Sequence, residues 1–286
     1  MNRVALLSVS AASALAIGSS ASAVIVDGVN TAAEYGPALS TQSIGTGFGD
    51  NFNELDEAFG NTDDGAVNLL VTGNLETNGN RFVLLIDTGD NGGAATVPAS
   101  GGNFDQNLVA GDTFDIAPEY MLFIAESFGN LFASLRDLTN DTEVVGVGLG
   151  SVADFNTNGG VTSGSFGGLS VAWDNTNTGG VGGTAGAADS GAGATAGFEF
   201  SLDPSLLGNP TDDLNVTALI VASSGFYSNQ FLGPLPETTG NLGDGVQDLT
   251  LISGDQFFTV TNTIPEPASL ALLALGGAVA LGRRRK

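Results

Sequence analysis

Three consecutive stretches decide the fold class of this chain: Ala66-Val67-Asn68-Leu69-Leu70-Val71-Thr72-Gly73-Asn74-Leu75, Thr77-Asn78-Gly79-Asn80 and Arg81-Phe82-Val83-Leu84-Leu85-Ile86-Asp87. The first has alternating apolar residues at Val67, Leu69 and Val71, which is the two-residue period of a β-strand. The third is apolar on both faces, as a central strand of a sandwich is. Because Asn-Gly accepts the positive φ angles of a type I′ turn, the middle stretch predicts a β-hairpin between the two strands.

Short apolar runs separated by turn residues continue along the chain and predict further strands. A three-stranded meander is expected from residues 120–125, 131–137 and 142–149, joined by residues 127–130 and 139–141. Later strands are expected at residues 169–173, 197–202, 215–222 and 256–261. A single helical turn is predicted at residues 203–208, where Asp203 is a suitable cap and Pro204 a suitable first helical residue.

At least nine predicted strands, no long helix and 17 phenylalanines in the chain indicate an all-β fold. We expect an antiparallel, jelly-roll-like β-sandwich that spans residues 24–264 as one domain. Within it, residues 156–197 contain 13 glycines among 42 residues. Residues 179–196 have too few apolar side chains to offset the entropy lost on ordering, which predicts a mobile surface loop there.

Residues 1–23 have the pattern of a secretory signal peptide. Arg3 gives the start a positive charge, residues 4–17 are apolar, and Ala21-Ser22-Ala23 supplies the small residues of a cleavage site. We therefore expect an N-terminal signal helix that is removed by cleavage after Ala23.

The other end of the chain combines a short motif, an apolar run and a basic terminus. Pro265-Glu266-Pro267 precedes the apolar residues 268–281, and Arg283-Arg284-Arg285-Lys286 ends the chain. The run is short for a bilayer core that needs about 20 residues, but snorkelling basic side chains would let it form a short transmembrane helix. This tail resembles the PEP-CTERM sorting signal. The resemblance implies an exported protein, transiently anchored by residues 265–286, which export machinery and an exosortase deliver to the cell surface or the extracellular matrix.

The chain between these two signals is strongly acidic. Residues 24–264 hold thirty acidic residues against two basic ones, Arg81 and Arg136, which gives a formal charge of −28. Since nucleic-acid binding depends on Lys and Arg side chains that neutralise phosphates, this composition excludes nucleic acid as a partner. Such a surface suits solubility outside the cell, high salt or divalent cations.

The absence of two residue types removes several kinds of chemistry. The chain has no cysteine and no histidine, so disulfides, Ser-His-Asp and Cys-His catalysis and ordinary zinc sites are excluded. No cofactor is indicated, but oxygen ligands for calcium remain. Asp, Asn and Gly are also the ordinary residues of turns. Four acidic turns are candidates for calcium: Asp63-Asp64-Gly65, Asp87-Thr88-Gly89-Asp90-Asn91, Asp174-Asn175-Thr176-Asn177 and Asp212-Asp213.

The predicted domain resembles the family-nine carbohydrate-binding and DOMON-like β-sandwiches. Val26-Asp27-Gly28-Val29 and Glu34-Tyr35-Gly36 are similar to the start of that family, and Trp173-Asp174-Asn175-Thr176-Asn177 is compatible with it. The resemblance implies a β-sandwich and, in some members, binding of sugar, haem or calcium. Sugar-binding members enclose the sugar between tryptophans, whereas this chain has only Trp173. Haem-binding members use Met or His, and this chain has no histidine.

Three functions are compatible with these observations. The first is a non-catalytic surface or matrix protein that binds polysaccharide, with Trp173 and Tyr227 as the aromatic residues best suited to stack on a sugar, although core packing is favoured for Trp173. The second is a structural matrix component without a discrete ligand, as the Gly/Ala/Thr-rich loop suggests. The third is a glycoside hydrolase, which needs only two facing carboxylates. No motif nominates such a pair, so we expect that the protein is not an enzyme.

Overall fold

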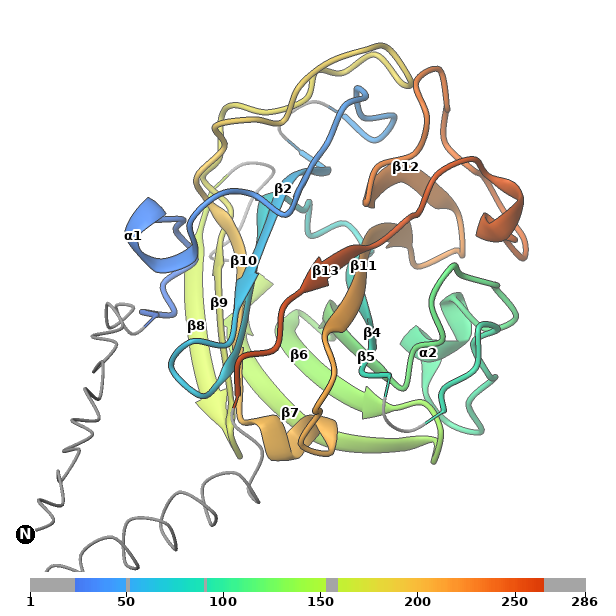
Figure 1. The fold of residues 1–286 in the computed structure, drawn as a ribbon. Helices are drawn as coiled ribbons and strands as arrows, with labels where there is room; N and C mark the ends of the chain where they lie inside the picture. Colours follow the sequence, from blue (N-terminus) through green and yellow to red (C-terminus); the bar gives the residue numbers. More distant parts are fainter. Residues whose placement is uncertain (1–23, 50–51, 90–91, 153–158, 265–286) are drawn as a thin grey trace, which may run out of the picture.

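The computed structural model describes residues 24–49, 52–89, 92–152 and 159–264, and it has an all-β architecture of two antiparallel sheets (Figure 1). The first sheet has six strands, in the order β1 (Ser40–Thr41), β2 (Glu54–Asn61), β3 (Val67–Asn74), β10 (Gly197–Leu202), β9 (Leu169–Asp174) and β8 (Val161–Phe166). The predicted all-β sandwich is thus confirmed at the level of two packed antiparallel sheets.

The second sheet has seven strands. Its order is β12 (Tyr227–Leu232), β11 (Leu214–Ala222), β4 (Asn80–Asp87), β5 (Tyr120–Ser127), β6 (Asn130–Asp137) and β7 (Thr142–Ser151), and β13 (Phe258–Val260) pairs with β11. The helical pieces are short: α1 (Ala32–Tyr35), α2 (Phe104–Leu108), η2 (Pro204–Leu207) and η3 (Leu249–Leu251). The jelly-roll-like strand order and the loss of residues 1–23 stay predictions.

The hairpin predicted from Asn78-Gly79 is wrong, because β3 and β4 belong to different sheets. β3 pairs with β2 and β10, whereas β4 pairs with β11 and β5. Among the described residues, the non-glycine residues with positive φ do not include Asn78, so a type I′ turn is not formed. Residues 75–79 instead carry the chain from one sheet to the other.

The predicted meander of β5, β6 and β7 is confirmed, and it contains the tight hairpin turn. β5 pairs with β6 in register from Tyr120↔Asp137 to Ser127↔Asn130. The two residues between them, Phe128 and Gly129, have φ angles of 51° and 78°. A type I′ turn needs positive φ at both of its central residues, which matches this pair.

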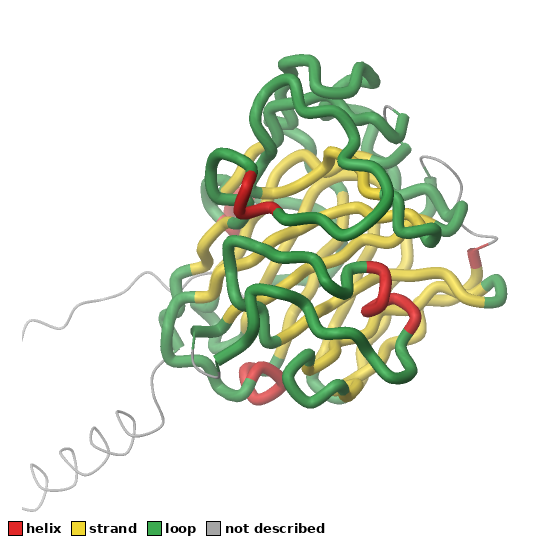
Figure 2. Tube along the Cα trace, turned by 90° about the vertical axis from the view of Figure 1, so that its right-hand side faces the viewer, coloured by secondary structure: helices red, strands yellow, loops and turns green. Residues whose placement is uncertain are grey.

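The hydrophobic core of the described residues has two large layers and a small cluster of Tyr35, Phe59 and Leu70, and only the layer between the sheets was expected. That layer includes Phe82, Trp173, Phe198 and Phe200, and Phe82 stacks on Phe198 with ring centroids 4.2 Å apart. The second layer lies on the outer face of the seven-stranded sheet, beneath long loops that include α2 and η3 (Figure 2). Its members include Val83, Leu85, Met121, Phe123 and Phe231. Burial on both sides explains why β4 is apolar on both faces.

The opening motif of the domain fastens the N-terminal segment to the outer face of the six-stranded sheet. Glu199 on β10 is fully buried and accepts hydrogen bonds from the backbone N–H groups of Asp27 and Gly28, both at 2.7 Å. Its second oxygen accepts from the Tyr35 hydroxyl at 2.8 Å. Gly28 has a φ of 83°, and a Cβ there would lie 2.8 Å from the backbone nitrogen of Asp174. The Asp-Gly and Glu-Tyr motifs therefore have a structural role in this chain.

Residues 179–196 form a loop without strands or helices, as expected, and backbone hydrogen bonds tie it to residues 42–46. Gly191 N donates to Gln42 O at 3.0 Å, and Asp189 N donates to Ser43 O at 2.9 Å. The many glycines allow close approach: a Cβ on Gly180 would lie 2.1 Å from a carboxylate oxygen of Asp56. The mobility of this loop stays a prediction.

In the described part of the chain, no helix is long and apolar enough to cross a membrane. The predicted signal helix and the predicted helix over residues 268–281 lie outside the described residues. The predicted turn at residues 203–208 is confirmed as η2. Asp203 accepts a hydrogen bond from Ser205 N at 2.9 Å, and Pro204 is the first helical residue.

Candidate functional site

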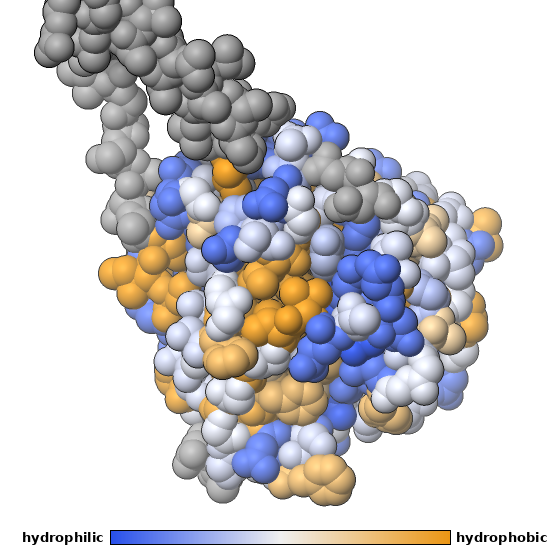
Figure 3. All heavy atoms as spheres, turned by 90° about the horizontal axis from the view of Figure 1, so that it is seen from below, coloured by the Kyte–Doolittle hydropathy of each residue, from blue (hydrophilic) through white to orange (hydrophobic). Residues whose placement is uncertain are grey.

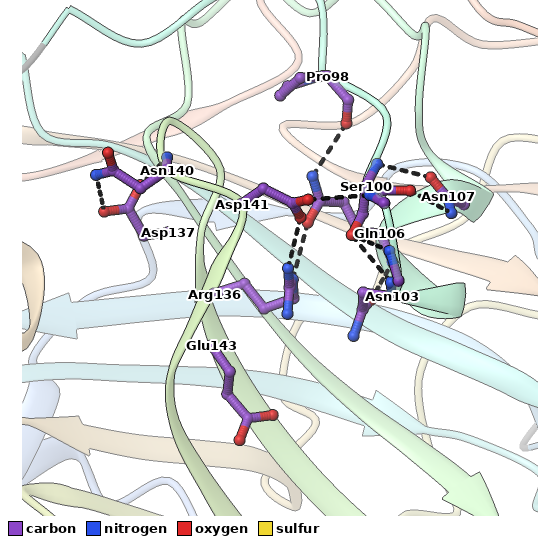
Figure 4. A network of polar contacts seen from close by, with 12 residues as sticks. Pro98, Ser100, Asn103, Gln106, Asn107, Arg136, Asp137, Asn140, Asp141 and Glu143 are labelled. Carbon is purple, nitrogen blue, oxygen red and sulfur yellow. Dashed lines mark hydrogen bonds and ion pairs between the residues drawn. The ribbon is translucent and has the colours of Figure 1, made fainter.

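The two arginines of the acidic domain hold α2 onto the outer face of the seven-stranded sheet. Arg81 on β4 pairs with Asp105 on α2, with Nε 2.6 Å from Oδ1. Arg136 on β6 donates from Nε to the side-chain oxygen of Gln106 at 2.8 Å and from Nη2 to Asp141 at 2.8 Å (Figure 4). Both arginines are buried. The described residues therefore present no basic side chain to an external partner.

A pocket opens beside the end of α2, with a volume of about 270 Å³. Three loops form its walls: the chain that leaves α2, the turn between β11 and β12, and a loop after β12. Among the residues that line it, Asp112 is the only ionisable one. The described lining residues are Asn107, Leu108, Ala110, Asp112, Ser224, Gly225, Gly245 and Val246.

Asp112 joins the three walls of this pocket. Its Oδ1 accepts a hydrogen bond from the backbone N–H of Gln247 at 2.6 Å, and its Oδ2 contacts the hydroxyl of Tyr227 on β12. The same hydroxyl lies 3.0 Å from the carbonyl oxygen of Leu108. One phenol proton cannot serve both acceptors fully. A protonated Asp112 would donate to Tyr227, which would then donate to Leu108, so that every group has a partner.

The protonated Asp112 that this hydrogen-bond chain requires forms in mildly acidic solution. Burial raises the pKa of Asp112 to about 6, although the hydrogen bonds from Gln247 and Tyr227 oppose the rise. Burial and the neighbouring carboxyl also raise the pKa of Tyr227. The pocket thus holds one carboxyl that changes its charge in mildly acidic solution, next to the exposed polar side chains of Asn107 and Ser224. Hydrolysis of a glycoside needs two carboxyls, and the described lining residues offer one.

A second group of buried carboxyls lies on β2, under the glycine-rich loop. Glu54 and Asp56 are both fully buried. Asp56 accepts hydrogen bonds from Val181 N at 3.1 Å and from Asn177 Nδ2 at 2.9 Å. Burial, followed by the negative charge of Glu54, raises the pKa of Asp56 to about 9. Asp56 is therefore protonated at neutral pH, and it fastens the loop to the sheet.

The structure places the two aromatic candidates of the sequence in the interior. Trp173 is fully buried between the sheets, and its ring centroid lies 5.5 Å from that of Phe198. In this structure its indole has no exposed face on which a sugar could stack, so it takes the core-packing role that was favoured. Tyr227 is also buried, but its hydroxyl reaches the pocket residue Asp112. Sequence reasoning did not single out Asp112, since nothing in its neighbours distinguishes it from the other acidic residues.

The carboxylates of the four candidate calcium turns mostly bond to their own turns. Asp64 accepts from Ala66 N at 3.1 Å, Asp87 from Gly89 N at 2.8 Å and Asp174 from Thr176 N at 3.0 Å. Asp213 accepts from Asn262 N at 2.9 Å. Within the described ranges, no group of three or more acidic side chains is placed to hold a metal ion. Asp90 and Asn91 lie outside those ranges.

The signal-cleavage residues Ala21 and Ala23 and the tail residues Pro265, Glu266, Pro267, Arg283, Arg284 and Arg285 also lie outside the described residues. Comparison with known families nevertheless identifies the tail. Residues 263–286 match the PEP-CTERM protein-sorting motif. No curated protein and no solved structure shows a significant match to the chain. The matched motif implies that this chain is an exported, cell-surface protein that is processed by an exosortase.

Proposed function

We propose that residues 24–264 form a non-catalytic module that binds polysaccharide at the cell surface or in the extracellular matrix, through the pocket that Asp112 lines. The observation that carries this proposal is the pocket itself. It joins a buried carboxyl, two exposed polar side chains and the exposed apolar side chain of Val246 in a depression of about 270 Å³. A sugar ring offers the matching chemistry, with hydroxyls for the polar groups and C–H faces for the apolar one.

The charge of the domain narrows the class of polysaccharide. Both arginines are buried. Arg81 pairs with Asp105, and Arg136 bonds to Gln106 and Asp141. An anionic polysaccharide would therefore meet an acidic surface without a compensating cation. We propose neutral or amino-bearing glycans as ligands, and anionic glycans only where divalent cations bridge the two surfaces.

Calorimetric titration of the exported protein with neutral, amino-bearing and anionic polysaccharides tests this proposal, first with calcium and then with a chelator. Saturable binding to a neutral or amino-bearing glycan is the expected result. Dependence on calcium would assign a role to the acidic turns. Absence of binding in both conditions would favour the structural matrix component, and release of reducing sugar from the panel would favour the hydrolase.

Delivery through the tail has its own test. The transient anchoring proposed for residues 265–286 requires that the surface protein loses the chain beyond the Pro265-Glu266-Pro267 region. Mass spectrometry of the cell-associated protein should find a C-terminus at or near this motif. An intact Lys286 on most molecules would contradict the processing.

A further inference from the structure

The sorting motif begins inside the folded domain. The match covers residues 263–286, and the first two of these, Thr263 and Ile264, are part of the described structure. Ile264 packs against the core between the two sheets. It is followed directly by Pro265, so no linker separates the sandwich from the Pro-Glu-Pro motif.

Hydrogen bonds hold this last segment against the end of the sandwich that lies at the bottom of Figure 1. Thr62 is buried, and its hydroxyl oxygen accepts from Thr263 N at 2.7 Å. Asn262 N donates to Asp213 Oδ1 at 2.9 Å, and Asn262 Nδ2 donates to Pro210 O at 2.8 Å. These contacts tie the segment to two loops, residues 62–65 and residues 210–213. We call the surface of these two loops the base.

The short connection limits how far an enzyme can stay from the base. An extended chain spans at most about 3.6 Å per residue, so the end of Pro267 lies within about 11 Å of Ile264. A protein surface that acts on Pro265-Glu266-Pro267 must then approach the two loops of the base. The folded domain therefore forms part of what the processing enzyme encounters.

We propose that the base is the face of the sandwich that the exosortase contacts while it processes the tail. Seen from below, this end of the molecule combines hydrophilic and hydrophobic surface (Figure 3). Asp63, Asp64, Asp212 and Asp213 are all exposed on the base, and both arginines of the described chain are buried elsewhere. The matching enzyme surface is basic or rich in hydrogen-bond donors.

The test measures how fast newly exported protein loses its tail, by pulse-chase labelling in cells that carry the sorting enzyme. The main variant is Asp63→Lys with Asp212→Lys. Within the described residues, the Asp63 carboxylate accepts one long hydrogen bond, at 3.3 Å from the hydroxyl of Thr263. The matched control is Glu237→Lys with Asp244→Lys, which reverses two exposed charges after β12. A third chain inserts ten Gly/Ser residues between Ile264 and Pro265, and a fourth combines this insertion with the main variant.

We expect the main variant to be processed roughly 10-fold more slowly than the native chain. Losing the electrostatic attraction between the base and the enzyme slows their association by about this factor. The control should keep the native rate. In the chain with the insertion, the enzyme can reach the Pro-Glu-Pro motif without approaching the base. The same two substitutions should therefore leave the processing rate of that chain unchanged. Melting temperatures of the exported proteins check folding, and Asp212→Lys alone replaces the main variant if the double substitution does not fold.

The proposal is overturned if the main variant is processed at the native rate, if the control is slowed equally, or if the insertion leaves the effect of the two substitutions unchanged. The last result would place their effect in export rather than in a contact with the base. A native chain that is never processed would overturn it as well.

Discussion

Arg81 and Asp105 form an ion pair that is almost entirely removed from water. The distance from Nε to Oδ1 is 2.6 Å, and the two side chains keep 8 % and 10 % of their exposure. The remaining guanidinium nitrogens donate to the carbonyls of Gly79, Asn80 and Glu126. The pair joins β4 to α2, and it thereby fixes the chain that leads into Asp112 and the pocket.

Asp105→Ala should destabilise the protein strongly, because it leaves a buried guanidinium without its carboxylate. Breaking a buried pair on one side costs about 3–5 kcal/mol of unfolding free energy. Asp141→Ala is the matched control: Asp141 keeps 40 % of its exposure in its pair with Arg136, so its loss should lower the unfolding free energy much less than the loss of Asp105. Urea unfolding measures both. Equal losses for the two variants would contradict the role of Arg81.

Asp112 should make stability fall as the pH rises through 6. Its pKa is raised in the fold, from 3.8 to about 6, so the protonated form is the stabilising one. This contribution is complete below pH 3.8 and lost as the pH passes 6, which amounts to a loss on the order of 2–3 kcal/mol. Asp112→Asn mimics the protonated carboxyl, and it should be more stable than the native protein at pH 7. Identical pH profiles of unfolding for the two proteins would contradict this.

Asp56 should make the stability fall further as the pH rises into the alkaline range. Its pKa is raised from 3.8 to about 9, so its contribution is complete below pH 3.8 and disappears as the pH rises to 9. Ionisation places a second charge beside Glu54 under the loop of residues 179–196. Asp56→Asn should therefore remove part of the loss of stability between pH 7 and pH 10, measured as the urea midpoint. An unchanged slope in this variant would show that Asp56 is not the group responsible.

The composition and the hydrogen bonds of the loop of residues 179–196 lead to opposite expectations about its mobility. Its composition predicts mobility, whereas the bonds from Val181 N to Asp56 and from Gly191 N to Gln42 O favour order. Hydrogen exchange separates the two: amides of a tied loop should exchange at least roughly 100-fold more slowly than those of an open chain. Exchange at the rate of an unstructured peptide would support the mobile loop.

Sequence reasoning was most successful where the evidence is local. The periodicity of β5, β6 and β7 and the cap of η2 depend on neighbouring residues, and they were predicted correctly. The Asn78-Gly79 turn misled because the pairing of β3 and β4 depends on distant strands: β10 and β11 take the places beside them. β2, β8 and β12 were missed, since their residues are too polar or glycine-rich to show an apolar period.

The candidate site was less predictable than the fold. Asp112 differs from the other acidic residues through its hydrogen bonds with Tyr227 and Gln247, and these two residues lie more than a hundred positions away in the chain. Trp173 was a possible sugar contact, with core packing favoured, and the register of β9 against β10 that places it between the sheets cannot be predicted from neighbouring residues. The sorting tail, by contrast, is recognised from consecutive residues, and for that reason the sequence was sufficient.

Binding of the exported protein to polysaccharide, compared between the native chain and one variant that fills the pocket, tests the proposed function most directly. Ser224→Trp places a large ring in the pocket, and the neighbouring exposed Ser223→Trp, outside the described lining, is its control. We predict saturable binding for the native protein and for Ser223→Trp, and a loss of at least about 10-fold in affinity for Ser224→Trp. Equal binding by all three proteins, or no binding by the native one, would contradict recognition at this pocket.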